Sequence, residues 1–379
     1  MKRKILSNLL KFSLLCVLAG FSNAEALDND MASEFSPVDS NRVPEVLTMI
    51  SESTKNNYEK IKSWQGKLDI VTEYLYDGDR AKEIFAEDIN ASCEAPKKLL
   101  EHRETDIEFY LDAENELLYV EYYNDSAKPL RYIDLENSRD LEAKGVLATR
   151  RAILTPEYQI DCTAETMRDG VVTSRKAVKN ARPKTGSGCE GHPVYDPRGS
   201  LSVGEPVWEF FPMLIDYIKE HGGYSVGGVD FQVEERKTED TNDYRIIMPA
   251  RIQQGDEKFL IHEMVFSGEN GFNIVSYETA YRNKNDLNKI ILKRVILKYK
   301  VYDDVYVTHH RLEKVYEPQD GELNTEKTII FKGQKVNESI PKQTFTYENL
   351  DLKNGDKFVD TIEGKEYIFQ DANLVPITD

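Results

Sequence analysis

The segment VPEVLTMISESTKNNYEKIKSWQGKLDIVTEY, residues 43–74, joins a predicted helix to a predicted strand. Apolar side chains recur with a helical period from Val43 to Ile61 and form a single apolar stripe. In the second half of the segment the period changes to two, so that Leu68 and Ile70 fall on one side of a strand. A helix with one apolar stripe must pack on another element, and the strand that follows begins such a surface.

A second amphipathic helix and a long run of strands complete the predicted architecture. The helix lies in GEPVWEFFPMLIDYIKEHGG and ends at Gly222 and Gly223, as helices commonly do. From Tyr224 to Lys332, strand-like segments alternate with turn signals at roughly hairpin spacing. Many strands in one meander must curl. We therefore predict an α+β fold, a long twisted antiparallel β-sheet curled into a half-barrel and covered on its concave side by amphipathic helices.

The N-terminal residues have the features of a secretory signal peptide. Lys2, Arg3 and Lys4 make a basic start, an apolar run covers residues 14–21, and small residues follow. We predict that residues 1–26 are a signal peptide and that the protein is exported, either periplasmic or secreted. No later segment is apolar enough to span a bilayer, so we expect no transmembrane segment in the mature chain.

The rest of the chain is expected to fold as one unit. Residues 27–42 are polar and irregular and are predicted to be a mobile leader. Residues 43–379 are predicted to form a single β-rich domain with insertions near residues 80–103 and 163–207. A split into two domains near residue 200 is the alternative.

The charge of the chain excludes some partners. The formal net charge is −18, and cleavage after Ala24 would remove four basic residues and take it to −22. Nucleic acid and anionic lipid surfaces repel such a protein. We therefore expect no nucleic-acid partner.

Three cysteines would remain after export, namely Cys93, Cys162 and Cys189. In an oxidising compartment two of them are expected to pair. We favour a Cys162–Cys189 disulfide because it would close a polar, glycine- and lysine-rich segment, with a stabilisation of about 3 kcal/mol. Pairing of Cys93 with either of the other two is left open.

Motifs for catalysis, metals and nucleotides are weak or missing. Cys189 stands three residues before His192 in a glycine-rich loop, but the local sequence matches no known nucleophile signature. His309 and His310 are adjacent, so on a strand they point to opposite faces. We therefore predict no catalytic residue, no metal site and no cofactor.

Aromatic side chains are the remaining candidates for a site. Several lie on elements expected to face one another, where a concave sheet could hold an apolar ligand beneath its helices. Ordinary core packing is the alternative for the same residues. The ligand-binding candidates are Trp64, Tyr74, Tyr76, Phe109, Tyr119, Trp208 and Phe211.

The segment 43–74, together with the strand meander that ends near Lys332, resembles the LolA/LolB-like superfamily of bacterial lipoprotein carriers, which includes the RseB sensor. The stretches DPRG at 196–199 and FTYENLDLKNGDKFVD at 345–360 look like a group of uncharacterised exported bacterial proteins of that kind. The resemblance implies a half-barrel with a lid of helices and a hydrophobic cavity for acyl chains.

Three functions follow in order of preference. The first is an extracytoplasmic binding or carrier protein for a lipid, a lipoprotein or another apolar ligand. The second is a structural or interaction module of the cell envelope that contacts another envelope protein and binds no small molecule. The third is a hydrolase that uses Cys189 or scattered carboxylates.

Overall fold

The computed structural model describes residues 35–89, 94–123, 131–142, 147–166, 172–182, 206–226, 229–252, 258–283, 289–318 and 321–377. The predicted signal peptide lies outside these residues, and so do Cys93, Cys189 and His192. Residues 35–42, at the end of the predicted leader, are described. They pair with the sheet and bury Val38.

Three α-helices are present among the described residues: α2 (Val43–Lys60), α3 (Gly78–Asp88) and α4 (Val207–His221). The helices expected in residues 43–61 and before Gly222 are thus confirmed. Gly222 ends α4 with φ of 74°, a left-handed conformation that costs glycine little. Short 3₁₀ turns follow at η2 (Gly268–Asn270), η3 (Lys342–Phe345) and η4 (Tyr347–Leu350).

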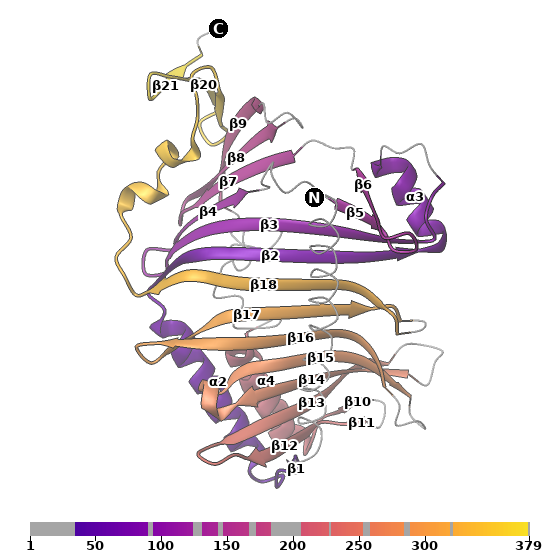
Figure 1. The fold of residues 1–379 in the computed structure, drawn as a ribbon. Coiled ribbons are helices and arrows are strands. Elements are labelled where there is room, and N and C mark those ends of the chain that lie inside the picture. Colours follow the sequence, from indigo (N-terminus) through magenta and orange to yellow (C-terminus); the bar gives the residue numbers. More distant parts are fainter. Residues whose placement is uncertain are drawn as a thin grey trace.

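Most of the strands belong to one large sheet of 19 strands (Figure 1). Its main path, in spatial order, runs through β1 (Ser36–Pro37), β12 (Gln232–Lys237), β13 (Asn242–Ile252), β14 (Lys258–Ser267), β15 (Asn273–Asn283), β16 (Lys289–Tyr302), β17 (Val305–Tyr316), β18 (Leu323–Val336), β2 (Ser63–Asp77), β3 (Lys98–Asp112), β4 (Leu117–Tyr123), β7 (Leu147–Leu154), β8 (Tyr158–Thr166), β9 (Val172–Ala181), β19 (Lys357–Asp360), β20 (Lys365–Gln370) and β21 (Asn373–Pro376). Two further strands, β5 (Arg131–Asp134) and β6 (Arg139–Glu142), branch from β3, whereas β10 (Ser225–Val226) and β11 (Val229–Asp230) pair separately.

The fold is therefore α+β and dominated by strands, and the sheet is not closed, because β1 and β21 each pair with one neighbour. The prediction of a purely antiparallel sheet needs a correction. β19 pairs in parallel with β9, since the C-terminal segment crosses the sheet through η3 and η4 before it reaches that edge. In Figure 1 this segment is the yellow chain beside β7, β8 and β9.

Helices α2 and α4 lie together on one face of the sheet, against β12 to β16, and this face is called the helix-side face below (Figure 1). Apolar side chains of both helices pack with those of the strands. The helix residues of this cluster include Val46, Leu47, Ile50, Phe211, Leu214 and Ile215, and the strand residues include Ile246, Met264, Val295 and Leu297. The apolar stripe of each helix thus covers only part of a very long sheet.

Two segments differ from the sequence prediction. The polar segment after Cys162, expected to be an irregular insertion, contains β9, which forms a regular antiparallel ladder with β8. β9 has few apolar residues, and its small Ala177 packs in the core on the face opposite α2 and α4. The segment 80–103, predicted to be an insertion, contains most of α3 and the start of the long strand β3.

A buried asparagine fixes α2 to the sheet. Asn57 Nδ2 donates a hydrogen bond to the carbonyl oxygen of Tyr306 (2.9 Å), and its Oδ1 accepts one from the Tyr306 amide (2.8 Å). Tyr306 lies near the start of β17. The helix position therefore depends on a pair of backbone hydrogen bonds as well as on apolar packing.

We expect Asn57→Ala to lower the free energy of unfolding by about 1–3 kcal/mol, because the backbone N–H and C=O of Tyr306 lose buried partners. The exposed neighbour Asn56 is the matched control. Asn56→Ala should leave stability unchanged or slightly higher, since alanine is the better helix former. Urea unfolding followed by circular dichroism measures both, and equal effects of the two changes would contradict the anchoring role.

Candidate functional site

The predicted site residues Trp64 and Phe109 meet on the helix-side face. Trp64 on β2 is fully buried, stacks on Phe331 with ring centroids 5.5 Å apart, and meets the edge of Phe109 at 5.6 Å. They belong to an apolar cluster that spans β17, β18, β2, β3, β4 and β7. Helix residues add little to this cluster, with Ile61 and Tyr58 at the end of α2 as the members among the described residues.

The predicted residues of α4 lie at the other end of the same face. Phe211 is fully buried and contacts Phe266 edge to face, with ring centroids 5.8 Å apart. Trp208 is partly buried and packs on Tyr58 of α2 at 4.7 Å. Contacts between the two helices thus lie beside the Trp64 cluster, which Tyr58 also joins.

Tyr74 and Tyr76 lie toward the end of β2, where both contact polar side chains and Tyr76 also packs against the apolar cluster beneath α3. The Tyr76 hydroxyl donates a hydrogen bond to Glu101 Oε2 (2.8 Å). Arg103 lies over the ring of Tyr74 at 5.3 Å and pairs with Glu101. These two tyrosines belong to a polar rim of the face.

Tyr119 is placed on the opposite side of the sheet from Trp64. Its strand neighbours Leu118 and Val120 belong to the Trp64 cluster, whereas Tyr119 packs with Ile153 beneath the C-terminal segment. The seven candidates are therefore distributed over both faces, and a ligand-binding role for them stays a prediction.

Between the two apolar clusters of the helix-side face lies an arginine that the sequence analysis did not single out. In the strand register, Leu297 lies opposite Arg311 and Arg311 lies opposite Ile329, so all three share a face. Arg311 is 6% exposed. Its Nη2 donates to Glu313 Oε2 (3.2 Å), but its buried Nε has no hydrogen-bond partner.

Positive side chains surround the carboxylate of Glu313, and this group (Lys293, Arg311 and Lys327 around Glu313) is called the basic centre below. Lys293 Nζ lies 2.6 Å from Glu313 Oε1, and Lys327 is the cross-strand neighbour of Glu313 on β18. Burial alone would raise the pKa of Glu313, but the hydrogen bond from Lys293 and the nearby cations outweigh it, so the pKa lies below its usual value. Glu313 is therefore ionised at neutral pH.

A neutral histidine, His262, lies on the same face, in the row of cross-strand neighbours His262, Thr279 and Lys293. His262 Nδ1 is 2.8 Å from the hydroxyl of Tyr277 and 3.2 Å from that of Thr279. Burial lowers the pKa of His262, so the ring is uncharged at neutral pH. Thr279 is the cross-strand neighbour of Lys293, which joins this group to the basic centre.

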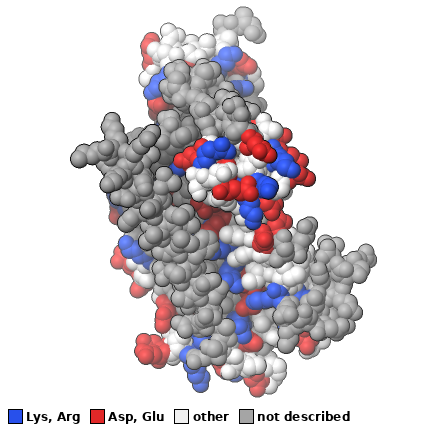
Figure 2. Space-filling view, turned by 45° about the vertical axis from the view of Figure 1, so that its right-hand side comes forward, with Lys and Arg blue, Asp and Glu red and all other residues white. Residues whose placement is uncertain are grey.

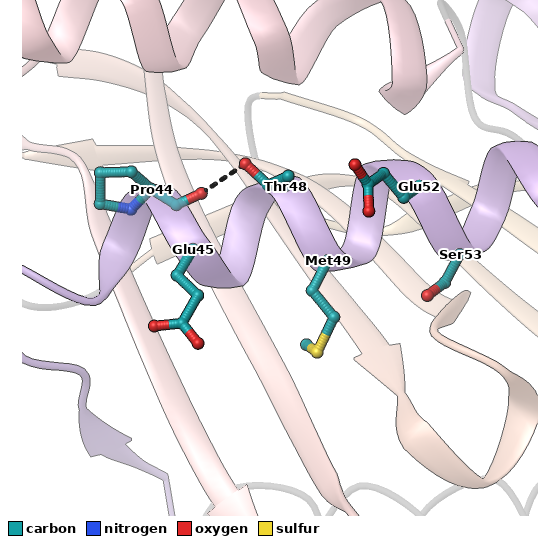
Figure 3. A pocket seen from close by; sticks show the side chains of 6 residues that line it. All are labelled: Pro44, Glu45, Thr48, Met49, Glu52 and Ser53. Atoms are coloured by element: carbon teal, nitrogen blue, oxygen red, sulfur yellow. Dashed lines mark hydrogen bonds between the residues drawn. The ribbon is translucent and has the colours of Figure 1, made fainter.

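A separate pocket of about 410 Å³ opens on α2 itself, and Figure 3 shows the residues that line it. They are Pro44, Glu45, Thr48, Met49, Glu52 and Ser53. None of the predicted aromatic candidates lines this pocket. Thr48 is occupied in a hydrogen bond to the carbonyl oxygen of Pro44 (2.8 Å).

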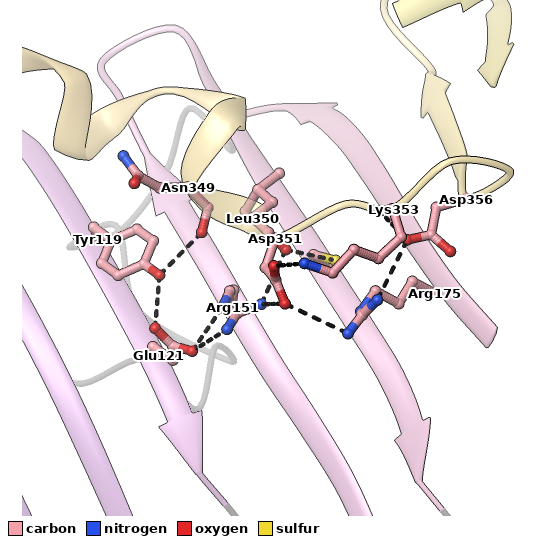
Figure 4. A network of polar contacts seen from close by, with 10 residues as sticks. Tyr119, Glu121, Arg151, Arg175, Asn349, Leu350, Asp351, Lys353 and Asp356 are labelled. Carbon is pink, nitrogen blue, oxygen red and sulfur yellow. Dashed lines mark hydrogen bonds and ion pairs between the residues drawn. The ribbon is translucent and has the colours of Figure 1, made fainter. Parts of the chain in front are cut away.

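On the other face, a polar network fastens the C-terminal segment to the sheet (Figure 4). Arg151 on β7 donates from Nε to Glu121 Oε1 (2.7 Å) and from Nη1 to the carbonyl oxygen of Leu350 (3.2 Å). It also pairs with Asp351, whose Oδ2 lies 3.4 Å from Arg175. Glu121 also accepts from Tyr119 (2.9 Å).

The predicted disulfide is not shown by the structure. Cys162 is a free, buried thiol whose Sγ lies 3.8 Å from the carbonyl oxygen of Leu350, beneath this network. Burial raises its pKa to about 11, so the thiol is protonated at neutral pH. Because Cys189 lies outside the described residues, the pairing stays a prediction.

Other chemistry is sparse in the part of the chain that the structure covers. No three His, Cys, Asp or Glu side chains converge there in a way that could hold a metal ion. No helix in this part is both long enough and apolar enough to cross a membrane. Acidic and basic side chains are intermingled on the described surface in Figure 2.

Comparisons with known proteins give structural neighbours at low similarity. No protein-family model matches the chain, and no curated protein matches it. A DUF1329 family protein from Desulfovibrio piger superposes with a TM-score of 0.34 and 8% identity, over 80% of this chain and 99% of that one. A domain assigned to outer membrane lipoprotein sorting, from Vibrio parahaemolyticus, superposes with a TM-score of 0.33 and 10% identity, over 80% and 97%. At these TM-scores neither structure decides the function of this chain.

We expect Arg151→Met to destabilise the protein by about 1–3 kcal/mol, because the Glu121 carboxylate loses a charged partner in a mostly buried site. It should also speed proteolysis near Leu350. The exposed pair Arg131–Asp140 supplies the control, and Arg131→Met should cost about 0–1 kcal/mol. If Arg151→Met changed neither urea unfolding nor the rate of cleavage, the network would not fasten the segment.

Proposed function

We propose that the protein is an extracytoplasmic binding or carrier protein for a lipid or another ligand with an apolar chain. The observation that supports this best is the extent of the apolar helix-side face. It runs from Ile246 and Met264 under the helices, past Leu297, to Ile329 and Phe109. Such a face is far wider than two short helices cover.

The two parts of the face differ in what packs on them. Under α2 and α4 the strands meet two helical stripes, as in an ordinary core. Around Trp64 the described helices contribute only Tyr58 and Ile61. We place the apolar chain of the ligand on this second part, where it would pack against the apolar side chains around Trp64.

In this proposal the open, curled sheet acts as a half-barrel and the helices act as its lid. Trp64 and Phe109 form the floor, Trp208 borders it from α4 through Tyr58, and Phe211 lies farther along the same face. Tyr74 and Tyr76 lie at the polar rim. Ligand entry requires the end of α2 to move away from the sheet, so the Asn57–Tyr306 hydrogen bonds set part of the cost of opening.

The two tryptophans of the chain allow a direct test, since Trp64 and Trp208 both lie on this side of the sheet. We expect a brominated fatty acid methyl ester, whose bromine atoms quench indole fluorescence at short range, to quench the protein in a saturable way. In the variant Trp208→Phe the remaining Trp64 should be strongly quenched, whereas in Trp64→Phe the remaining Trp208 should be quenched less. Fluorescence titration against the unbrominated ester is the control.

Native mass spectrometry of protein purified from its own envelope fraction is the second measurement. A bound species with the mass of a lipid supports the proposal. Absence of saturable quenching, together with a protein mass free of any lipid, would contradict it. Recovery of a stoichiometric envelope protein in the same preparation would instead favour the structural or interaction module.

A further inference from the structure

The basic centre is positively charged, whereas the molecule as a whole is negatively charged. The chain has a formal net charge of −18, yet Lys293, Arg311 and Lys327 gather around Glu313 on the helix-side face. These four side chains together carry a surplus of positive charge. They lie between the two apolar clusters, because Leu297 and Ile329 flank Arg311 in the strand register.

One hydrogen-bond donor of Arg311 has no acceptor in its buried position. Its side chain is 7% exposed, it makes one ion pair to Glu313, and its Nε–H is buried without a hydrogen-bond partner. A buried donor without an acceptor costs free energy, and a buried cation costs more when it is incompletely paired. Packing alone gives no reason for an arginine at a register position between two apolar residues.

The partly buried Tyr299 lies at the same place. Tyr299 packs against both apolar clusters, and the charge of Arg311 acts on its hydroxyl. That hydroxyl already donates to the carbonyl oxygen of Ile274 (2.7 Å). The Arg311 guanidinium therefore lies among apolar side chains, close to a tyrosine whose donor is already engaged.

The chemistry of such a place is that of an anion site next to an apolar chain site. Guanidinium binds carboxylate and phosphate oxygens through parallel N–H groups and is less strongly hydrated than an ammonium group. Lys293, with its side chain 36% exposed, can add a second positive charge from the solvent side. An acyl chain on the Trp64 cluster would bring its head group toward this centre.

We propose that the basic centre binds the anionic head group, carboxylate or phosphate, of an amphipathic ligand whose apolar chain lies on the helix-side face. This inference rests on the proposed function and adds the charge of the ligand to it. Arg311 donates a hydrogen bond from its Nε–H to an oxygen of the head group, and Lys293 and Lys327 balance the charge of the head group. Glu313 holds the cations in position and competes with the ligand for them.

The test compares ligands that share one chain and differ in the head group. A brominated fatty acid, its neutral methyl ester and the matching lysophosphatidic acid are titrated against the tryptophan fluorescence of the protein. We expect the two anions to bind about tenfold or more tightly than the ester, the size of one charge-assisted hydrogen bond. Arg311→Met should reduce this preference to about twofold or less while the affinity for the ester stays the same.

Four further variants keep the test independent of folding. Arg311→Lys retains the charge and should keep part of the preference. Glu313→Gln removes the competing carboxylate and should tighten binding of both anions. Lys298→Met is the matched control for Lys293→Met, because Lys298 is exposed on the same strand and pairs in register with His310 rather than with the basic centre. Only Lys293→Met should weaken the anions.

The outcomes separate this inference from the proposed function. Equal affinity for acid and ester would overturn the head-group site while the carrier function stands. No binding of any of the three chains would overturn both. Inorganic phosphate that binds as tightly as the fatty acid would overturn the assignment to an amphiphile, because it would show a site for a free anion.

Discussion

The structure depends on one constraint. One face of the sheet is apolar and must be buried, but this face extends farther than helices α2 and α4 can cover. α2 and α4 supply two apolar stripes, and these match β12 to β16. The sheet continues through β17, β18, β2, β3 and β4 with the same face still apolar. A sheet of this length must curl to bury such a surface, and a curled sheet with a partial cover is a natural place for an apolar ligand.

The opposite face is covered by different means at its β7 to β9 end. There the C-terminal segment packs Phe345, Leu350 and Phe358 on β7 to β9, and Arg151 fastens it through backbone and carboxylate contacts. The pairing of β19 with β9 completes this cover. The two faces of the sheet are therefore buried by different segments, the β7 to β9 end of one by the C-terminal segment and the β12 to β16 end of the other by α2 and α4.

The sequence predicts the elements whose pattern is local. The helical period gives α2, and alternation with turn signals gives β12 to β18. β9 was missed because its residues are mostly polar and its stability comes from the ladder with β8. The parallel β9–β19 pair joins segments nearly two hundred residues apart, as its register of Lys176 with Lys357 shows, and no local signal encodes it.

The site was harder to predict than the fold because a site depends on which face each side chain takes. Trp64 and Tyr119 both read as buried aromatics, but strand parity sends them to opposite faces. From the sequence, Arg311 is expected to face solvent because it is charged. Only the strand register beside Leu297 and Ile329 shows that it lies on the helix-side face. A local rule that is broken without compensation inside the fold commonly marks function, and Arg311 breaks one because it is buried between Leu297 and Ile329. In the proposed head-group site, an anionic oxygen would supply the acceptor that the Arg311 Nε–H lacks.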